Sequence, residues 1–456
     1  MGYQDFIKRK SQIETNAGFP PVWMPDFLFD FQRHLVEWSI RKGRAALFAD
    51  CGLGKTPMQL VWAENVVRKT NGRVLVLTPL AVAHQTVREA EKFGIEAVYS
   101  REGKNLGKIT VANYERLHYF DAKDFVACVC DESSMLKAIQ GKRRRIVTEF
   151  MKKMDYRLLC TATAAPNDYI ELGTHSEALG NLGQIDMLNT FFKSSDDAQH
   201  VWNKAGDFWT KHKWLFKAHG EEAFWKWVCT WAMAIQKPSD MGFPDNNFHL
   251  PPLQVYQHVV DCPSAFEGEL FPRVAVTLSE QRQERRLTMT ERCERVADLV
   301  DHSEPAIAWC HLNPEGDMLE EIIPDAKQVR GATTDEEKEE LLKAFSDGEL
   351  RVMVTKPTIA GFGLNWQHCS HMTFFPSHSF EQYYQGVRRC WRFGQTNPVK
   401  VDIITTPGEA GVTANLNRKA EQAAKLFDRV VSLMSDASHS NNVPIFNHKE
   451  EVPSWL

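Results

Sequence analysis

The sequence contains no C-x-x-C pair, no apolar run close to the length of a membrane helix, and no excess of basic residues. Ten scattered cysteines without paired spacing make a zinc site of the usual kind unexpected and fit a protein kept in a reducing compartment. A bilayer-spanning helix needs about 20 apolar residues. The first residues, MGYQDFIKRK, also lack the apolar core of a signal peptide. We therefore expect a cytoplasmic protein with no membrane partner.

Composition places the chain among ordinary globular proteins. It has 456 residues, 43% of them hydrophobic and 25% charged, which is enough for more than one domain with a large core. The formal net charge is −5 at pH 7. Because the chain is not basic overall, any nucleic-acid site must be a local patch.

Short runs rich in Val, Ile and Leu alternate with helical segments in two parts of the chain. The first part has runs at 45–48, 74–77, 109–112, 126–130 and 157–160, and the second has runs at 305–310, 352–355, 371–375 and 399–404. Apolar runs of this length between helices are typical of buried parallel strands. We predict an α/β protein with two parallel-sheet lobes.

The stretch between the two lobes, residues 176–250, has a different composition. It carries six of the 13 tryptophans: Trp202, Trp209, Trp214, Trp225, Trp227 and Trp231. We predict a helical, Trp-rich insertion whose rings form a core. The alternative is that one or two rings stack on bases or wedge a duplex. The predicted domains are 1–175, 176–250 and 251–435, followed by a loosely ordered tail at 436–456.

The segment ADCGLGKT, residues 49–56, follows an apolar run and precedes a helical segment. This is the strand–loop–helix context of a phosphate-binding loop. Gly52 and Gly54 let backbone N–H groups turn toward phosphate oxygens. Lys55 would neutralise the phosphates, and Thr56 would ligate Mg²⁺. The expected cofactors are therefore ATP and Mg²⁺, although Ala49 replaces the first glycine of the general pattern.

An acidic pair, Asp131-Glu132, directly follows the apolar run at 126–130. The end of a parallel strand places both carboxylates at the sheet edge where a phosphate-binding loop also lies. Asp131 is the predicted second Mg²⁺ ligand, and Glu132 is predicted to orient and deprotonate the attacking water.

With these blocks in order, the chain resembles the superfamily 2 helicases and translocases, and among them the Swi/Snf-type ATPases with a DEAD/DEAH-like box. The A-x-x-G-x-G-K-T loop is the variant which that superfamily favours. Further similar blocks are Gln32 before the loop, Thr78-Pro79-Leu80, Asn113-Tyr114-Glu115, Thr161-Ala162-Thr163, GFGLN at 361–365 and QGVRRCWRFGQ at 385–395. The last resembles the arginine motif Q-x-x-x-R-x-x-R-x-G-Q, with Arg388 as an extra arginine.

The resemblance implies two RecA-like lobes that hydrolyse ATP in the cleft between them. Arg389 and Arg392 align with the finger arginines and join Lys55, Asp131 and Glu132 as catalytic residues. Gln32 resembles the adenine-reading glutamine, and Gln385 belongs to the nucleotide-binding set. The implied nucleic-acid contacts are Thr78, Asn113, Thr161, Thr163, Thr355 and Asn365.

We expect a monomeric ATP-dependent DNA translocase, with duplex DNA as the favoured partner, single strands next and RNA last. Its compact size would suit a bacterial cell or a phage-infected one, where a protein partner supplies targeting. Three alternatives stay open: a strand-separating helicase, an ATP-binding DNA scaffold without motor activity, and a P-loop kinase.

Three further features can be explained by ordinary protein structure without a functional role. The basic run at 142–145 either extends the nucleic-acid track or is a solvated helix face. The arginine-rich segment 280–300 is interpreted as a solvated charged helix. Histidines of the second lobe are interpreted as ordinary polar or core residues because their spacing does not fit a metal site: His311, His368, His371 and His378.

Overall fold

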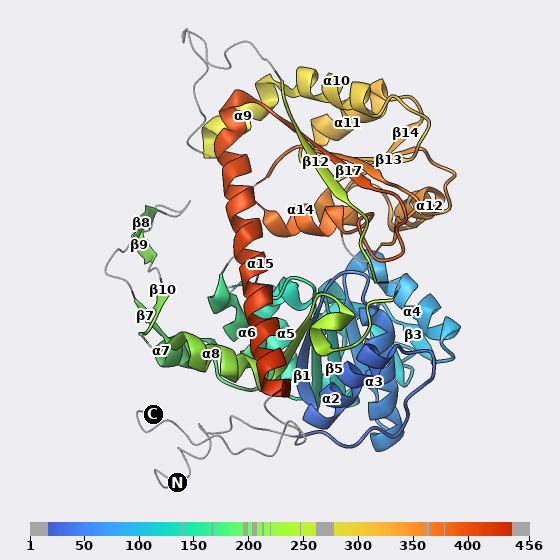
Figure 1. Ribbon diagram of the computed structural model, residues 1–456. Helices are drawn as coiled ribbons and strands as arrows, with labels where there is room; N and C mark the ends of the chain where they lie inside the picture. Colours follow the sequence, from blue (N-terminus) through green and yellow to red (C-terminus); the bar gives the residue numbers. More distant parts are fainter. Residues whose placement is uncertain are drawn as a thin grey trace. The chain divides into compact units, whose positions relative to one another are not determined.

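The computed structural model separates into two compact units (Figure 1). Unit 1 is Met1–Pro244 with Ala424–Leu456, and unit 2 is Asp245–Ala423. The residues that the structure describes are 17–138, 141–165, 168–194, 199–202, 208–211, 214–218, 220–246, 248–260, 278–361, 364–377 and 379–439. Most of the predicted tail therefore lies outside the described residues. Its first residues, 436–439, belong to the helix α15 (Ala410–His439).

Unit 1 is built on a seven-stranded sheet in the order β11-β1-β6-β5-β2-β4-β3, with every neighbouring pair parallel. The strands are β1 (Arg44–Ala49), β2 (Val74–Thr78), β3 (Ala97–Tyr99), β4 (Ile109–Asn113), β5 (Ala127–Asp131), β6 (Tyr156–Cys160) and β11 (Ala232–Ile235). Five of them coincide with the apolar runs predicted for the first lobe. The sequence gives no signal for β3 because it is three residues long and only half-buried.

Helices precede or connect most of these strands, and parallel pairing requires such crossover connections. They are α2 (Asp30–Lys42), α3 (Lys55–Thr70), α4 (Ala83–Lys92), α5 (Lys142–Met151) and α6 (Leu172–Leu179). On α2, Phe31, Leu35 and Trp38 recur at helical spacing and are all buried. This helix ends at Gly43, whose φ of 71° suits glycine because it has no Cβ.

The Trp-rich stretch differs from the predicted helical insertion. It contains α7 (Gln184–Phe191) and α8 (Gly220–Cys229), but also two short antiparallel pairs and the edge strand β11. The pairs join β7 (Phe192–Ser194) to β10 (Trp214–Phe216), and β8 (Gln199–Trp202) to β9 (Phe208–Lys211). β11 pairs with β1, so this stretch completes the sheet of unit 1.

The core interpretation is confirmed for three of the tryptophans. Trp225, Trp227 and Trp231 are at most 5% exposed and lie in the main hydrophobic cluster of unit 1. Trp214 is half-buried against the same cluster. The side chains of Trp202 and Trp209 lie outside the described residues. Buried rings cannot stack on bases, so the wedge hypothesis loses these three candidates.

Unit 2 is built on a six-stranded sheet in the order β12-β17-β16-β13-β15-β14, again parallel throughout. The strands are β12 (Leu253–Val259), β13 (Ala306–Trp309), β14 (Ala326–Val329), β15 (Val352–Thr355), β16 (His371–Phe374) and β17 (Val399–Thr405). The sequence missed β12 because this edge strand is exposed at most positions and has no continuous apolar run. The two predicted parallel sheets are confirmed.

The helices of unit 2 are α9 (Leu278–Leu287), α10 (Met289–Leu299), α11 (Asn313–Ile322), α12 (Asp335–Ser346), α13 (Pro357–Ala360), α14 (Phe380–Val387) and the start of α15. Two hydrophobic clusters that include β13 residues form its core. In the part of the chain that the structure describes, no helix combines the length and the apolar character needed to cross a bilayer.

Candidate functional site

The phosphate-binding loop lies between β1 and α3 in unit 1. Gly52 and Gly54 adopt φ angles of 88° and 76°, a left-handed region that favours glycine. A Cβ on Gly54 would lie 2.3 Å from Nε2 of Gln32. That same amide nitrogen donates a 2.9 Å hydrogen bond to the carbonyl of Leu53. The structure therefore brings the predicted adenine-reading residue into direct contact with the loop.

Lys55 is the first residue of α3, and its side chain folds back over the loop. Its Nζ donates to the carbonyl oxygens of Ala49 at 3.0 Å and Asp50 at 3.3 Å. The first turn of a 16-residue helix also presents backbone N–H groups that have no intrahelical partner, which favours an anion there. Thr56 is half-buried one residue later. The loop thus gathers positive charge and N–H donors at one point.

Asp131 ends β5 and is 7% exposed. Burial and the neighbouring Glu132 carboxylate raise the pKa of Asp131 to about 6. A hydrogen bond from Nε2 of Gln59, 2.7 Å from Oδ1, and the charge of Lys55 act in the opposite direction. The interaction with Lys55 shows that the predicted acidic residue and the predicted lysine lie in one electrostatic environment.

Glu132 has a φ of 52°, an uncommon conformation for a residue with a side chain. Its Oε2 accepts a 3.3 Å hydrogen bond from Oγ1 of Thr161, which follows β6. The same Thr161 hydroxyl accepts a 3.0 Å hydrogen bond from the N–H of Thr163. Strained backbone held by surrounding contacts is typical of functional sites. The loops after β5 and β6 are therefore tied together through the predicted water-activating carboxylate.

These residues fit a nucleotide with its metal. The donor set at the site consists of the Thr56 hydroxyl and the Asp131 carboxylate, which are oxygen ligands of the kind that Mg²⁺ prefers. Burial and Glu132 raise the pKa of Asp131, and a bound cation would act in the opposite direction. Thr56 and Asp131 would hold the metal, and Lys55 with the N-terminus of α3 would hold the phosphates.

Three residues near the acidic pair were given no role by the sequence. Gln59 lies one helical turn after Lys55, and that spacing is the only signal that could have found it. The hydroxyl of Tyr114 donates a 2.6 Å hydrogen bond to the carbonyl of Asp131. His175 on α6 is fully buried, and burial lowers its pKa to about 4 despite hydrogen bonds to the backbone of Glu171 and Ser133.

Five of the six predicted nucleic-acid residues are buried. Thr78 and Asn113 end neighbouring strands and are paired in register, so the structure brings them together. Within the described residues, Oγ1 of Thr78 and Oδ1 of Asn113 have no hydrogen-bond partner. Thr355 ends β15 and donates to the carbonyl of Val329 at 2.9 Å. Thr161 and Thr163 are buried beside Glu132, whereas Asn365 is exposed in unit 2.

The basic run at 142–145 begins α5, and two of its arginines form ion pairs. Arg143 lies 2.7 Å from Glu115, and Arg144 lies 2.8 Å from Glu177. Glu115 belongs to the predicted block that follows β4. These pairs reduce the charge that the run offers to a phosphate backbone, which favours the interpretation of a partly neutralised helix face.

The arginine block of unit 2, residues 385–395, begins in the last turn of α14 and continues beyond it. The side chain of Arg389 donates to the carbonyls of Gln385 at 2.9 Å and Leu364 at 2.9 Å, and to Oε1 of Gln385 at 3.2 Å. Arg392 donates to the carbonyl of Leu364 at 3.3 Å and to Oδ1 of Asn365. Both predicted finger arginines therefore converge on the segment at 364–365, and Gln385 orients one of them.

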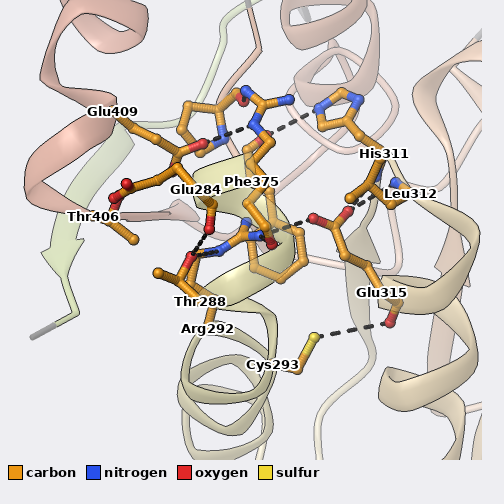
Figure 2. Close-up of polar contacts among 12 residues, drawn as sticks. Glu284, Thr288, Arg292, Cys293, His311, Leu312, Glu315, Phe375, Thr406 and Glu409 are labelled. Carbon is orange, nitrogen blue, oxygen red and sulfur yellow. Dashed lines mark hydrogen bonds and ion pairs between the residues drawn. The ribbon is translucent and has the colours of Figure 1, made fainter. Parts of the chain in front are cut away.

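The segment 280–300 is not the solvated charged helix that the sequence suggested. It is interrupted at Thr288, between α9 and α10. Arg292 is fully buried, lies 3.1 Å from Oε1 of Glu315 and sits over the ring of Phe375 (Figure 2). The pattern of charges along the helix could not predict that Arg292 is buried, because its acidic partner, Glu315, lies 23 residues away in the sequence.

The same network fixes the loop that follows β13. The second oxygen of Glu315 accepts hydrogen bonds from the backbone N–H groups of His311 and Leu312 at 2.9 and 2.8 Å (Figure 2). Nε2 of His311 lies 3.0 Å from the carbonyl of Phe375, and burial together with Arg285 lowers its pKa to about 4. Arg285 itself lies 2.8 Å from Oε1 of Glu409. His311 is thus a half-buried, neutral residue of a structural network.

Comparisons with known proteins agree with this arrangement. A family model described as the helicase conserved C-terminal domain matches residues 280–394. Two solved structures of S. cerevisiae Dbp5 bound to RNA and ADP BeF₃ are each 12% identical to the chain and cover 89% of it and 98% of their own length. The TM-score is 0.56 for the structure of a single-residue variant of Dbp5 and 0.53 for the other Dbp5 structure. The Sulfolobus solfataricus SWI2/SNF2 ATPase core in complex with dsDNA is 16% identical, with a TM-score of 0.42, and covers 85% of this chain and 90% of that one. Sequence comparison with curated proteins gives no match.

Residues 280–394 therefore match a helicase C-terminal domain, and the chain shares the fold of the Dbp5 structures, with two RecA-like lobes as predicted. The matched family model lies entirely within unit 2 and ends at Gly394, inside the arginine block. At 12% identity the likeness to Dbp5 shows the fold alone.

Proposed function

We propose that the chain is a nucleic-acid-stimulated ATPase that translocates on DNA, with duplex DNA as the favoured track. The observation that carries this proposal is the convergence of Lys55, Asp131 and Glu132 at the carboxyl edge of one parallel sheet. That edge is where ligands bind in open α/β folds. The helicase-like fold supports the same reading.

The residues of unit 1 have distinct tasks in this proposal. Lys55 and the first N–H groups of α3 bind the phosphates and offset their charge. Thr56 and Asp131 hold Mg²⁺, which when bound draws charge from the phosphate oxygens. Glu132, oriented by Thr161, accepts a proton from the attacking water. Gln32 binds the loop at Leu53 and contacts the base from there.

The arginines of unit 2 complete the proposed machinery. Arg389 and Arg392 bring positive charge to the terminal phosphate, a contribution worth about 10³–10⁵ in rate in related NTPases. Their contacts with Leu364 and Asn365 hold both guanidinium groups on one segment. ATP bound in unit 1 would thereby depend on unit 2 for hydrolysis, and this dependence couples turnover to movement.

The choice of track rests on the arginine motif, which resembles that of duplex translocases. A Dbp5 structure contains RNA, so RNA is a necessary comparison. Strand separation is the second candidate. The burial of Trp225, Trp227 and Trp231 removes three of the rings that could form a wedge. Trp214 is only half-buried, and the side chain of Trp209 lies outside the described residues.

The first experiment measures ATP hydrolysis with no nucleic acid and with duplex DNA, single-stranded DNA, forked DNA and RNA, at one stated salt concentration. Duplex stimulation followed by triplex displacement would support translocation on duplex. Unwinding of a labelled fork would favour the helicase, and stimulation by RNA alone would overturn the DNA assignment.

Lys55→Ala is the decisive variant. We expect turnover to fall at least about 100-fold, since the lysine charge acts on the phosphates in the transition state. Lys153→Ala is the matched control because Lys153 is exposed in the same unit. A Lys55→Ala protein with normal turnover would reject the site, and a wild-type protein with no turnover on any nucleic acid would revive the scaffold hypothesis.

A further inference from the structure

Arg388 is the residue of the arginine block that the sequence pattern leaves without a task. It is 1% exposed, although it follows directly after α14 in a segment rich in charge. A buried cation is costly unless its surroundings compensate for the lost water. In the structure, aromatic rings lie close to the guanidinium group of Arg388 and offset part of the cost of its burial.

Three aromatic rings surround the guanidinium of Arg388. Its Cζ lies 4.9 Å from the ring centre of Trp391, 5.8 Å from that of Tyr384 and 5.8 Å from that of Phe393. A cation within about 6 Å of an aromatic face is attracted by the ring quadrupole, most strongly at tryptophan and when water is excluded. Tyr384 belongs to α14, whereas Trp391 and Phe393 belong to the segment after it. The cation therefore joins the helix to that segment.

The same two rings also hold the segment by which the chain enters unit 2. The indole N–H of Trp391 donates a 2.7 Å hydrogen bond to the carbonyl of Pro251. The ring of Phe393 meets that of Phe248 edge-on, with centroids 5.4 Å apart. The next residue, Pro252, accepts the 2.9 Å hydrogen bond from Val399 N–H at the start of the β12–β17 pair. The entry segment is thus attached to the arginine block before it joins the sheet.

Arg389 and Arg392 lie within the segment that this cage fixes. Arg389 follows the caged residue directly, and Arg392 lies between the two ring residues in the sequence. Their guanidinium groups point to Leu364 and Asn365, whereas the guanidinium of Arg388 points into the rings. The three arginines of the block therefore have two different environments, one aromatic and one polar.

We propose that Arg388 is a positioning residue whose caged cation fixes the segment carrying Arg389 and Arg392 and fastens it to the entry segment at 248–252. The entry segment and the two arginines then move as one body. The inference rests on the proposed function, because it assigns the fixed arginines to ATP hydrolysis.

Three variants test it. Arg388→Met keeps a long side chain among the rings without charge, and Arg388→Lys keeps a cation that aromatic faces still bind. Trp391→Phe keeps a ring and removes the N–H that binds Pro251. Arg286→Ala is the control, because Arg286 is an exposed arginine of the same unit.

The first readout is amide hydrogen exchange, which needs no enzymatic activity and so separates this inference from the proposed function. We expect Arg388→Met to accelerate exchange at least about tenfold in peptides covering both 245–252 and 388–395, with β13 and β15 unchanged. Trp391→Phe should accelerate it at 245–252. Acceleration at 388–395 alone, or throughout unit 2, would overturn the inference.

The second readout separates kcat from KM in nucleic-acid-stimulated hydrolysis. Displacing an acting group by about 1 Å can cost about 100-fold in rate, so kcat should fall about 10–100-fold in Arg388→Met. KM for ATP should stay within about twofold, because unit 1 holds the nucleotide. Arg388→Lys should recover most of kcat. Unchanged kcat in Arg388→Met, or no recovery in a folded Arg388→Lys, would contradict the positioning role. If Arg388→Met does not fold, Arg388→Lys and Trp391→Phe decide the question by the same measurements.

Discussion

The side-chain amide of Gln59 donates a 2.7 Å hydrogen bond to the carboxylate of Asp131. One residue lies on α3 and the other ends β5, and both are buried. The bond favours the ionised form of a carboxyl group whose pKa burial raises to about 6. Gln59 therefore keeps the proposed metal ligand closer to its charged state.

Gln59→Leu should raise the pKa of Asp131 by roughly one unit. Hydrogen bonds to charged groups contribute about 1.5–3 kcal/mol, and one pKa unit corresponds to about 1.4 kcal/mol. Because Mg²⁺ needs the deprotonated carboxylate, its apparent affinity should fall, most strongly below pH 7. Mg²⁺ titration of ATPase activity at several pH values measures this. Gln85→Leu is the control, since Gln85 bonds a carboxylate outside the site, on Glu89. Identical Mg²⁺ curves for Gln59→Leu and wild type would rule the role out.

Glu132→Gln should abolish most hydrolysis while nucleotide binding persists. The substitution keeps the size of the side chain and its contact with Thr161, but an amide cannot accept the water proton. General-base catalysis contributes about 10²–10⁴ in rate, and the loss should lie in that range. Fluorescent-nucleotide binding and steady-state turnover measure the two effects. Glu149→Gln on α5 is the exposed control. Loss of binding together with turnover would show that Glu132 acts on folding or affinity instead.

His175 should make unit 1 less stable as the pH falls. Burial lowers its pKa from 6.5 to about 4. Between these two pH values the side chain is protonated in the unfolded chain but not in the folded one. Above about pH 6.5 the buried histidine does not lower the free energy of unfolding. The loss of unfolding free energy grows as the pH falls toward 4, where it reaches roughly 3 kcal/mol. Urea unfolding of wild type and His175→Gln between pH 7.5 and 4.5 tests this. The variant should lose that part of the pH dependence, and parallel curves would contradict the assignment.

Glu315→Ala should destabilise unit 2 by about 3–5 kcal/mol, because it leaves the buried charge of Arg292 without its carboxylate. The double variant Arg292→Met with Glu315→Leu should recover much of that loss, since no buried charge remains. Arg330→Ala is the control: its pair with Asp317 has a similar length, 3.2 Å, but both side chains are about half exposed. We expect a change below about 1 kcal/mol there. Equal effects of Glu315→Ala and Arg330→Ala would reject the argument.

Much of the fold could be predicted because its signals are local. Runs such as 74–77 and 352–354 are apolar at every position, which is typical of a strand buried on both faces. The sequence did not predict β12, because that strand is exposed along most of its length. It did not predict β11, because the tryptophans before it suggested a helix. In both cases pairing with a distant strand, β17 or β1, defines the element.

The candidate site divides in the same way. Lys55, Thr56, Asp131 and Glu132 could be found because phosphate and Mg²⁺ chemistry needs those residue types directly after strands. Gln59 was missed, because its spacing from Lys55 does not reveal its partner. Asp131 lies 72 residues away, and only the packing of α3 beside β5 joins the two residues. The sequence also predicted a solvated charged helix at 280–300, although Arg292 is fully buried.

The sequence by itself determined the two parallel sheets and the motifs at their edges, since apolar runs and glycine-rich turns act over a few neighbouring residues. The motif already assigned Arg389 and Arg392 as the finger arginines, and only the tertiary structure decided that Arg388 lies among aromatic rings. Arg388, Arg389 and Arg392 are chemically identical, and their roles differ because of their surroundings. The rings of Tyr384, Trp391 and Phe393 lie around Arg388, whereas Arg389 and Arg392 bind the carbonyl of Leu364. Such contacts depend on the register of distant segments, which no local pattern encodes.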